Sequence, residues 1–482
     1  MKLPQIIQGG MGAGVSGWQL ARAVSCRGEL GVVSGTALDL ILMRRLQDGD
    51  PSGHLRRALA AFPDQAAAKR ILERYFVAGG RRSGEPFVGK PMGGARLDPQ
   101  LEELLVVANF AEVYLAKEGH AGLVGINYLN KIQAPLLPSL FGALLAGVDA
   151  VLVGAGIPVE IPGILDRLCA GVAAELPLHV RPGESGRTHK LLFEPPTTLV
   201  TEGRPLKRPW FIPIVSSATL AAVLVKKCPE RITGFVVEAP SAGGHNAPPR
   251  GSLKLNEQGE PIYGPRDAID PSAFQALGLP FWLAGAQGGP DQLARARAAG
   301  AAGIQVGTLF AFCEESGLRH DLKAEVMEQC RHGTPRVLQD PLASPTGFPF
   351  QVLSLPHTIS EREIYERRTR QCDLGYLREP YEQPDGTLGW RCAAEDPDAY
   401  VRKGGDVADT VGRKCLCNGL MANIGLAQVR GGAEELPLVT CGSDLAGVTQ
   451  LLGAGQSSYS AAAVLDLLLG KTAASADLPT AV

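Results

Sequence analysis

The sequence predicts an α/β protein: a closed (β/α)8 TIM barrel with lid insertions and a mixed, mostly helical C-terminal cap. Three observations predict it: short apolar runs alternate with helical stretches over residues 1–315, there are eight such runs, and the chain is 482 residues long. A barrel takes about 250 residues, which leaves room for an appendage. The hydrophobic share of 45% can supply a large core.

The eight apolar runs are nearly continuous, which is typical of strands buried on both faces. They cover residues 3–8, 30–34, 121–127, 150–154, 210–216, 234–238, 281–284 and 303–306. Helical stretches between them cover residues 17–25, 99–118, 136–147, 218–227 and 290–299. Eight strand-then-helix units favour a closed barrel over an open doubly wound sheet.

Two stretches rich in Pro, Gly and charged residues interrupt the alternation, at about 181–208 and 248–271. In the second, Asn256-Glu257-Gln258-Gly259 predicts the tip of a hairpin. Insertions after barrel strands lie on the catalytic face and act either as lids or as plain solvated loops. We expect residues 1–330 to form the barrel and residues 331–482 a cap folded onto it.

Composition narrows the class of protein. Lys and Arg number 47 against 49 Asp and Glu, so no basic excess points to nucleic acid. The first residues lack the apolar region of a signal peptide, and no apolar run reaches the roughly 18 residues of a membrane span. We therefore expect a cytoplasmic protein without a membrane partner. Because the cytoplasm is reducing, we expect its ten scattered cysteines to remain free thiols.

The first strand runs into the glycine-rich segment Gln8-Gly9-Gly10-Met11-Gly12-Ala13-Gly14. Residues 12–17 fit the spacing of a dinucleotide fingerprint, but the acidic residue expected at the second strand end is replaced by Ser34-Gly35-Thr36. A Rossmann interpretation is therefore the weaker alternative. Glycines at this strand end instead allow backbone amides to approach a flat ring system closely.

Two glycine clusters follow the seventh and eighth strands, Gly285–Gly289 and Gly307-Thr308. Many barrels bind phosphate at these two strand ends. Backbone amides and the Thr308 hydroxyl would meet the anion, aided by the positive end of a short helix that begins near Leu309. Tight turns explain either cluster alone, whereas the two together favour a phosphate site.

His245 follows the sixth strand in the segment Ala242-Gly243-Gly244-His245, on the face expected to bind phosphate. An imidazole with an ordinary pKa near 6.5 can take up or release a proton near neutral pH. This position favours a role in catalysis or cofactor contact, although a lone histidine is often structural. The other seven histidines have no comparable setting.

Asn127 ends the third strand, with Lys131 one turn further on. An amide there can bond the edge of a flavin, and a lysine can stabilise the negative charge of its reduced ring; the plainer alternatives are a cap and a surface charge. A zinc site at Cys372, Cys392, Cys415, Cys417 and Cys441 is disfavoured, because paired Cys-x-x-Cys spacing is absent. We therefore expect no metal.

Four motifs in this order resemble the nitronate monooxygenase (2-nitropropane dioxygenase-like) family, whose members are FMN-dependent barrels. They are residues 6–12, 31–35, 242–245 and 305–308, so the resemblance covers roughly residues 1–315. It implies that His245 is the active-site histidine, which abstracts the α-proton of a nitroalkane or assists oxidation of its nitronate. It also implies an FMN site made of Gly10, Met11, Gly12, Asn127, Gly243, Gly244, Gly285, Gly289, Gly307 and Thr308.

The chain departs from that family after His245, where it continues Asn246-Ala247-Pro248-Pro249-Arg250 rather than with glycine and often a second histidine. Its long insertions and C-terminal 150 residues also differ. In these respects it is similar to the trans-acting enoyl reductases of polyketide and polyunsaturated fatty acid synthesis, which share the FMN barrel and take NAD(P)H.

The leading hypothesis is an FMN-dependent oxidoreductase that oxidises alkyl nitronates or related carbon acids with O2. The alternatives are an NAD(P)H-dependent enoyl-thioester reductase and a non-catalytic scaffold that binds FMN or another phosphate ligand. We expect a small-molecule substrate and a homodimer as one compatible assembly. An acyl-carrier protein is the expected partner if the chain is an enoyl reductase.

Overall fold

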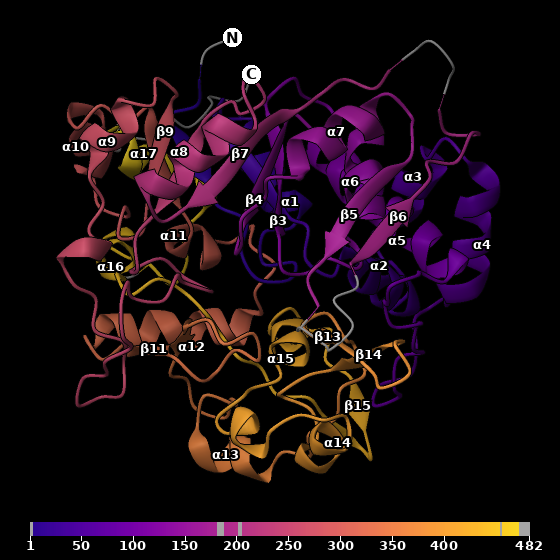
Figure 1. Ribbon diagram of the computed structural model, residues 1–482. Coiled ribbons are helices and arrows are strands. Elements are labelled where there is room, and N and C mark those ends of the chain that lie inside the picture. The colour runs from indigo at the N-terminus through magenta and orange to yellow at the C-terminus, as the bar shows by residue number, and fades with distance from the viewer. Residues whose placement is uncertain (1–2, 181–187, 201–204, 454–455, 472–482) are drawn as a thin grey trace, which may run out of the picture.

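The computed structural model describes residues 3–180, 188–200, 205–453 and 456–471. Eight parallel strands close into a barrel in the order β1-β10-β9-β8-β7-β4-β3-β2 (Figure 1). They are β1 (Ile6–Gln8), β2 (Leu30–Ser34), β3 (Val124–Leu129), β4 (Ala150–Gly154), β7 (Trp210–Val215), β8 (Phe235–Glu238), β9 (Phe281–Ala284) and β10 (Gly303–Val306). The predicted TIM barrel is confirmed, and each predicted strand overlaps one strand of the barrel.

The interior of the barrel is filled by apolar side chains that the strands point inward. This cluster consists of Ile7, Leu30, Val32, Ala150, Leu152, Ile212, Val236, Trp282 and Ala284. Trp282, which is fully buried, donates its Nε1–H to the carbonyl oxygen of Pro4 at 2.9 Å, so its one polar group is satisfied. Because the interior is packed, a ligand site has to lie at the rim of the barrel.

The helices between the strands surround the barrel. The five predicted ones are α1 (Trp18–Ser25), α5 (Pro99–Lys117), α6 (Leu136–Leu145), α8 (Ala218–Lys227) and α10 (Gln292–Ala298). The prediction missed α2 (Leu38–Gln47), α3 (His54–Ala60) and α4 (Gln65–Tyr75) after β2, and α7 (Ile161–Cys169) after β4. In the described part of the chain, no helix combines the length and apolar character needed to cross a membrane.

An antiparallel hairpin overlaps the first expected insertion: β5 (Ala174–Leu178) ends before residue 181, and β6 (His189–Phe193) lies within the insertion. Residues 181–187 and 201–204 of that stretch lie outside the described residues. In the second insertion, the Asn256 amide donates to the Glu260 carbonyl at 2.9 Å, which confirms the predicted turn. The insertion also holds η1 (Pro265–Asp267), and α9 (Pro271–Gln275) follows directly.

The barrel sequence ends with α11 (Thr308–Ala311) and α12 (His320–Arg331). Short helices and three antiparallel hairpins follow. They are β11 (Val337–Asp340) with β12 (Phe350–Leu353), α13 (Arg362–Arg367), β13 (Glu379–Glu382) with β14 (Leu388–Arg391), α14 (Pro397–Arg402), η2 (Val407–Thr410), α15 (Leu416–Asn423), β15 (Val429–Arg430) with β16 (Ala433–Glu434), α16 (Ala446–Leu451) and α17 (Ala461–Leu468).

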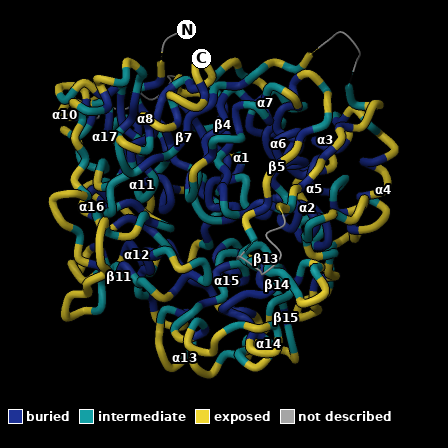
Figure 2. Tube along the Cα trace, in the orientation of Figure 1, coloured by how far each residue is buried: buried dark blue, intermediate teal, exposed yellow. Residues whose placement is uncertain are grey.

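The C-terminal region shares the core of the barrel's helical layer. Leu353, Met421, Val439, Val448 and Leu465 belong to one buried cluster with the apolar faces of the barrel helices, and Figure 2 shows dark buried chain in both parts. The division at residue 330 therefore remains a prediction about sequence organisation.

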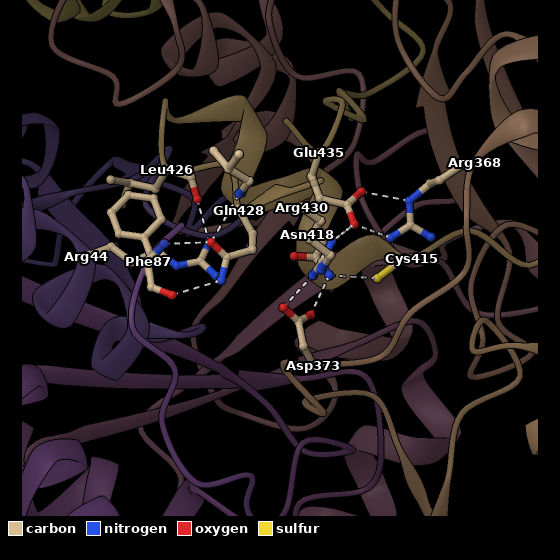
Figure 3. Close-up of polar contacts among 11 residues, drawn as sticks. Arg44, Phe87, Arg368, Asp373, Cys415, Asn418, Leu426, Gln428, Arg430 and Glu435 are labelled. Atoms are coloured by element: carbon tan, nitrogen blue, oxygen red, sulfur yellow. Dashed lines mark hydrogen bonds and ion pairs between the residues drawn. The ribbon is translucent and has the colours of Figure 1, made fainter. Parts of the chain in front are cut away.

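Polar contacts add to this core (Figure 3). Gln428 exchanges two hydrogen bonds with the backbone of Phe87, at 2.8 and 3.1 Å. Arg44, which is buried in α2, donates to the carbonyl oxygen of Leu426 at 2.5 Å. These hydrogen bonds thus connect the segment after β2 to the last third of the chain.

Candidate active site

A cavity of about 1610 Å³, including its open mouth, lies at the carboxyl ends of the barrel strands. Nine of the ten predicted cofactor residues and His245 line it: Gly10, Met11, Gly12, Asn127, Gly243, Gly244, Gly285, Gly307 and Thr308. Gly289 is not among the lining residues, whereas its neighbour Gly288 is. Closure of the barrel brings these residues together, because the carboxyl ends of parallel strands meet on one face.

Two glycines make the floor of this cavity possible. A Cβ added to Gly10 would lie 2.5 Å from the Cβ of Asn127, which is closer than side-chain carbons approach each other. Gly285 has a φ of +90°, and an added Cβ would lie 2.8 Å from the Ser241 Oγ. At both positions only glycine keeps the backbone this close to the cavity.

The end of the cavity at β10 is built partly by the C-terminal region. Thr308 begins α11, and its Oγ1 accepts a hydrogen bond from the Gly442 amide at 2.9 Å. The Gly244 amide donates to Thr440 Oγ1 at 2.9 Å, and a Cβ on Gly243 would lie 2.8 Å from the backbone of Cys441. Sequence reasoning identified Thr308 and the glycines after β8 but missed the segment 440–442 that lies against them.

Two buried side-chain oxygens beside this floor have no hydrogen-bond donor among the described residues, Asn127 Oδ1 and Gln305 Oε1. Both residues line the cavity, Asn127 from β3 and Gln305 from β10. Buried polar oxygens are rarely left without a partner, so both call for a donor. A ligand with N–H or O–H groups on its edge can satisfy them.

His245 is held by strand β12 and by Ser344. Its backbone forms an antiparallel bridge with Phe350, and the two rings meet edge to face at 4.8 Å. His245 Nε2 lies 2.7 Å from Ser344 Oγ, while Nδ1 has no protein partner among the described residues. Burial, with a smaller contribution from Lys131, lowers the pKa of His245 well below its usual value, so the imidazole is neutral at pH 7.

Hydrogen bonds continue from Ser344 to Lys131. Ser344 Oγ lies 2.8 Å from Thr346 Oγ1, and Lys131 Nζ donates to Thr346 Oγ1 at 3.2 Å. The backbone amide of Thr346 also donates to Ser344 Oγ, and this oxygen can accept a second proton from His245 Nε2–H while its own hydroxyl proton points at Thr346 Oγ1. The contacts thus form a continuous path from Lys131 to His245 Nε2.

Lys131 does not line the main cavity, where the sequence suggested that it could contact a flavin ring. It lies outside the lining of the main cavity and borders a second, smaller one beside Lys90 and Tyr376. Its ammonium also lies over the ring of Phe348, 4.4 Å from the centroid. Burial lowers its pKa from 10.5 to about 7, so Lys131 exchanges a proton near neutral pH.

Glu238 is a cavity residue that the sequence did not single out. It is the last residue of β8 and lines the cavity together with His245. Burial raises the pKa of its carboxyl from 4.5 to about 7. A carboxyl at a strand end of the catalytic face was the available signal for this residue.

The C-terminal region provides an apolar wall of the cavity. Its lining residues from this region include Phe350, Tyr376, Leu377, Leu416 and Leu420. These residues are at least 105 positions away from His245 in sequence, and no local pattern marks them. The wall makes one side of the site fit for a hydrocarbon or an aromatic group.

No family model matches the chain, and no curated protein does either. Solved structures similar in shape include FabK from Thermotoga maritima, with 15% identity over 98% of this chain and 93% of the other at a TM-score of 0.46. Nitroalkane oxidase from Streptomyces ansochromogenes matches at 16% identity, 97% and 95% coverage and a TM-score of 0.42.

The enoyl reductase domain of MlnA from Bacillus amyloliquefaciens matches at 12% identity, 97% and 94% coverage and a TM-score of 0.47. The strand order itself, rather than these distant likenesses, establishes the barrel.

Proposed function

We propose that this protein is an FMN-dependent oxidoreductase of nitronate monooxygenase type, which oxidises alkyl nitronates or related carbon acids with O2. The observation that carries the proposal is a neutral, enclosed histidine beside a glycine-floored cavity at the carboxyl ends of the strands. A neutral imidazole is ready to accept a proton, as oxidation of a carbon acid requires.

The cavity residues fit FMN. Gly10, Met11 and Gly12 would lie against the ring system, where a larger residue at position 10 collides with Asn127. Asn127 Oδ1 and Gln305 Oε1 would accept hydrogen bonds from the ring edge. Gly285, Gly307 and the Thr308 hydroxyl would hold the phosphate, with Gly288 in place of the Gly289 expected from sequence. When bound, FMN supplies the electron transfer between substrate and oxygen.

The side chains of this chain supply the proton transfer. His245 Nδ1, which has no protein partner among the described residues, takes the proton from a substrate in the cavity. His245 Nε2 then passes a proton to Ser344, and the Thr346 hydroxyl relays one to Lys131. Because the pKa of Lys131 is about 7, its neutral form can receive that proton at neutral pH.

The apolar wall favours a second candidate, an enoyl-thioester reductase that takes electrons from NAD(P)H. A hydrocarbon chain would lie against Leu377, Leu416 and Leu420. In this direction the path from Lys131 would deliver a proton to the substrate through His245. An acyl-carrier protein as partner, a homodimer and a cytoplasmic location remain predictions.

The two candidates differ in the donor and acceptor that turn the enzyme over. Purified protein that carries FMN and consumes O2 with an alkyl nitronate, without a nicotinamide, supports the oxidase. Anaerobic consumption of NADPH with an enoyl thioester, combined with inertness toward nitronates, supports the reductase. Protein that binds no FMN after incubation with it would contradict both and leave the non-catalytic scaffold.

His245→Ala tests the assigned base. We expect the variant to keep its FMN and to lose about 10²- to 10⁴-fold in kcat/KM, the usual effect of removing a general acid–base. The matched control is His332→Ala, because His332 is exposed and contacts only the exposed Glu328. Full activity in His245→Ala would remove this residue from the mechanism.

A further inference from the structure

Three cationic side chains line the second, smaller cavity, which lies beside the main one. This cavity measures about 500 Å³, including its opening, and the cations are Lys90, Lys131 and Arg378. Tyr376 lines both cavities and so forms a common wall between them. Among the described lining residues of the second cavity, the single carboxylate is that of Asp39. Positive charge therefore exceeds negative charge in this wall.

Asp39 is already engaged through both of its carboxylate oxygens. Oδ2 pairs with the Lys90 ammonium at 2.9 Å, and Oδ1 accepts a hydrogen bond from the Tyr376 hydroxyl at 2.7 Å. The side chains of Lys90 and Asp39 are only 5% and 1% exposed, so the two charges balance each other inside the protein. The other two cations, Lys131 and Arg378, gain no carboxylate from this pair.

Arg378 is held in place by the backbone rather than by a charge. Its Nε and Nη2 donate to the carbonyl oxygens of Gly375 and Gly93, and its guanidinium lies 5.5 Å from the ring centroid of Trp390. Among the described residues, Nη1 has no acceptor and the guanidinium has no carboxylate partner. A guanidinium fixed in this way is ready to donate its remaining N–H groups to an oxyanion.

Lys131 also contacts only uncharged groups. Its ammonium donates to Thr346 Oγ1 at 3.2 Å and lies over the ring of Phe348. Burial lowers the pKa of Lys131 to about 7, since no carboxylate nearby opposes the shift. An anion in the cavity would favour the charged form of this lysine and offset the cost of its burial.

The remainder of the second cavity is largely apolar. Leu101 and Leu105 lie four residues apart on one face of α5, and Leu97 and Leu178 line the cavity with them. Apolar walls with a few cationic groups fit an organic anion better than an inorganic ion. Because the Asp39 carboxylate lies in the same wall, it disfavours a doubly charged phosphate ester more than an anion with a single charge.

We propose that the second cavity binds an aliphatic carboxylate, with its carboxylate group on Arg378 and Lys131 and its hydrocarbon chain against the leucines of α5. Binding is non-covalent, and the ligand occupies a site separate from that of a substrate in the main cavity. This inference does not depend on the proposed function.

Calorimetric titration of the full-length protein with hexanoate at neutral pH tests the proposal. We expect about one hexanoate per chain, and binding of hexanamide at least about tenfold weaker, because this neutral analogue forms no charge-assisted hydrogen bond. Arg378→Gln should also weaken hexanoate binding at least about tenfold. Arg378 does not line the main cavity, so this loss would locate the ligand in the second one. The matched control, Arg362→Gln, should bind hexanoate normally, since Arg362 is exposed on α13 and pairs with Glu366 on the same helix.

A second measurement uses the unmodified chain, in case Arg378→Gln does not fold. In crystals grown with bromine-labelled hexanoate, we expect the bromine signal beside Leu101 and the carboxylate on Arg378. Equal binding of hexanoate and hexanamide, or bromine in the main cavity only, would overturn the proposal. Hexyl phosphate that binds at least about tenfold more tightly than hexanoate would overturn the assignment to a carboxylate.

Discussion

Replacing Lys131 with Met tests whether the lysine at the end of the path from His245 is buried in its neutral form. The structure lowers the pKa of Lys131 from 10.5 to about 7 because the ammonium is enclosed by protein. Each tenfold change in proton affinity is worth about 1.4 kcal/mol, so the fold disfavours the charged form by about 5 kcal/mol. Methionine has a similar length and carries no charge to bury.

This difference makes stability depend on pH. Between about pH 7 and 10.5 the unfolded chain binds the Lys131 proton and the folded chain does not, so Lys131 makes stability rise with pH in this window. From pH 7 to pH 9.5 that contribution amounts to about 3 kcal/mol. Groups that titrate elsewhere contribute equally to both proteins and cancel in the comparison.

Urea unfolding at these two pH values measures the effect. We expect the free energy of unfolding of the wild type to gain about 3 kcal/mol relative to Lys131→Met over this range. Lys69→Met is the control, because Lys69 is exposed on α4 and pairs only with the exposed Glu73; its curve should run parallel to that of the wild type. Parallel curves for Lys131→Met as well would refute the burial of a neutral lysine.

Two further substitutions test the cavity. Gly10→Ala places a Cβ 2.5 Å from the Cβ of Asn127 and should weaken FMN binding at least about tenfold, the equivalent of about 1.4 kcal/mol. Fluorescence titration measures it, and Gly89→Ala, where an added Cβ meets nothing within 4 Å, should bind FMN normally. Glu238→Gln should abolish a rise in the KM for an anionic nitronate between pH 6 and 8. In the wild type the carboxyl ionises near pH 7 and repels the anion, by about 1 kcal/mol or about fivefold in KM. The same rise in both proteins would mean that Glu238 does not act on the substrate.

The barrel was predictable because its strands are buried on both faces. Runs such as residues 30–34 and 150–154 are buried at every position. Such continuous apolar runs can be recognised as strands without knowing which strands pair with them. Helix α2 escaped prediction for a related reason. Nearly all of its residues are buried, so it lacks the polar stripe that marks an amphipathic helix.

The half of the site that comes from strand ends was also predictable, since barrel topology alone places His245, Asn127 and Thr308 on one face. The other half depends on contacts distant in sequence. Ser344 lies 99 residues from His245, and Thr440 lies 196 residues from Gly244. No local pattern encodes such pairs, because they form only when the C-terminal region packs onto the barrel.

Cys372, Cys392, Cys415 and Cys417, which line one small cavity in the C-terminal region, show the same limit. Spacing argued against a metal site, because only Cys415 and Cys417 are close in sequence. The structure brings the other two thiols to them through β14 and the loop after α13. A sequence motif captures residues on one turn, whereas residues from three segments meet only in the folded chain.

The hydrogen bond between Gly442 and Thr308 also sets an order of events during synthesis. Strand β10 completes the barrel at Val306, yet Thr308 receives its partner from a residue made 134 positions later. A nascent chain therefore cannot finish the end of the cavity at β10 until Gly442 has been made. Chains released before residue 440 lack the Thr440 and Gly442 contacts to Gly244 and Thr308 and should fail to retain FMN.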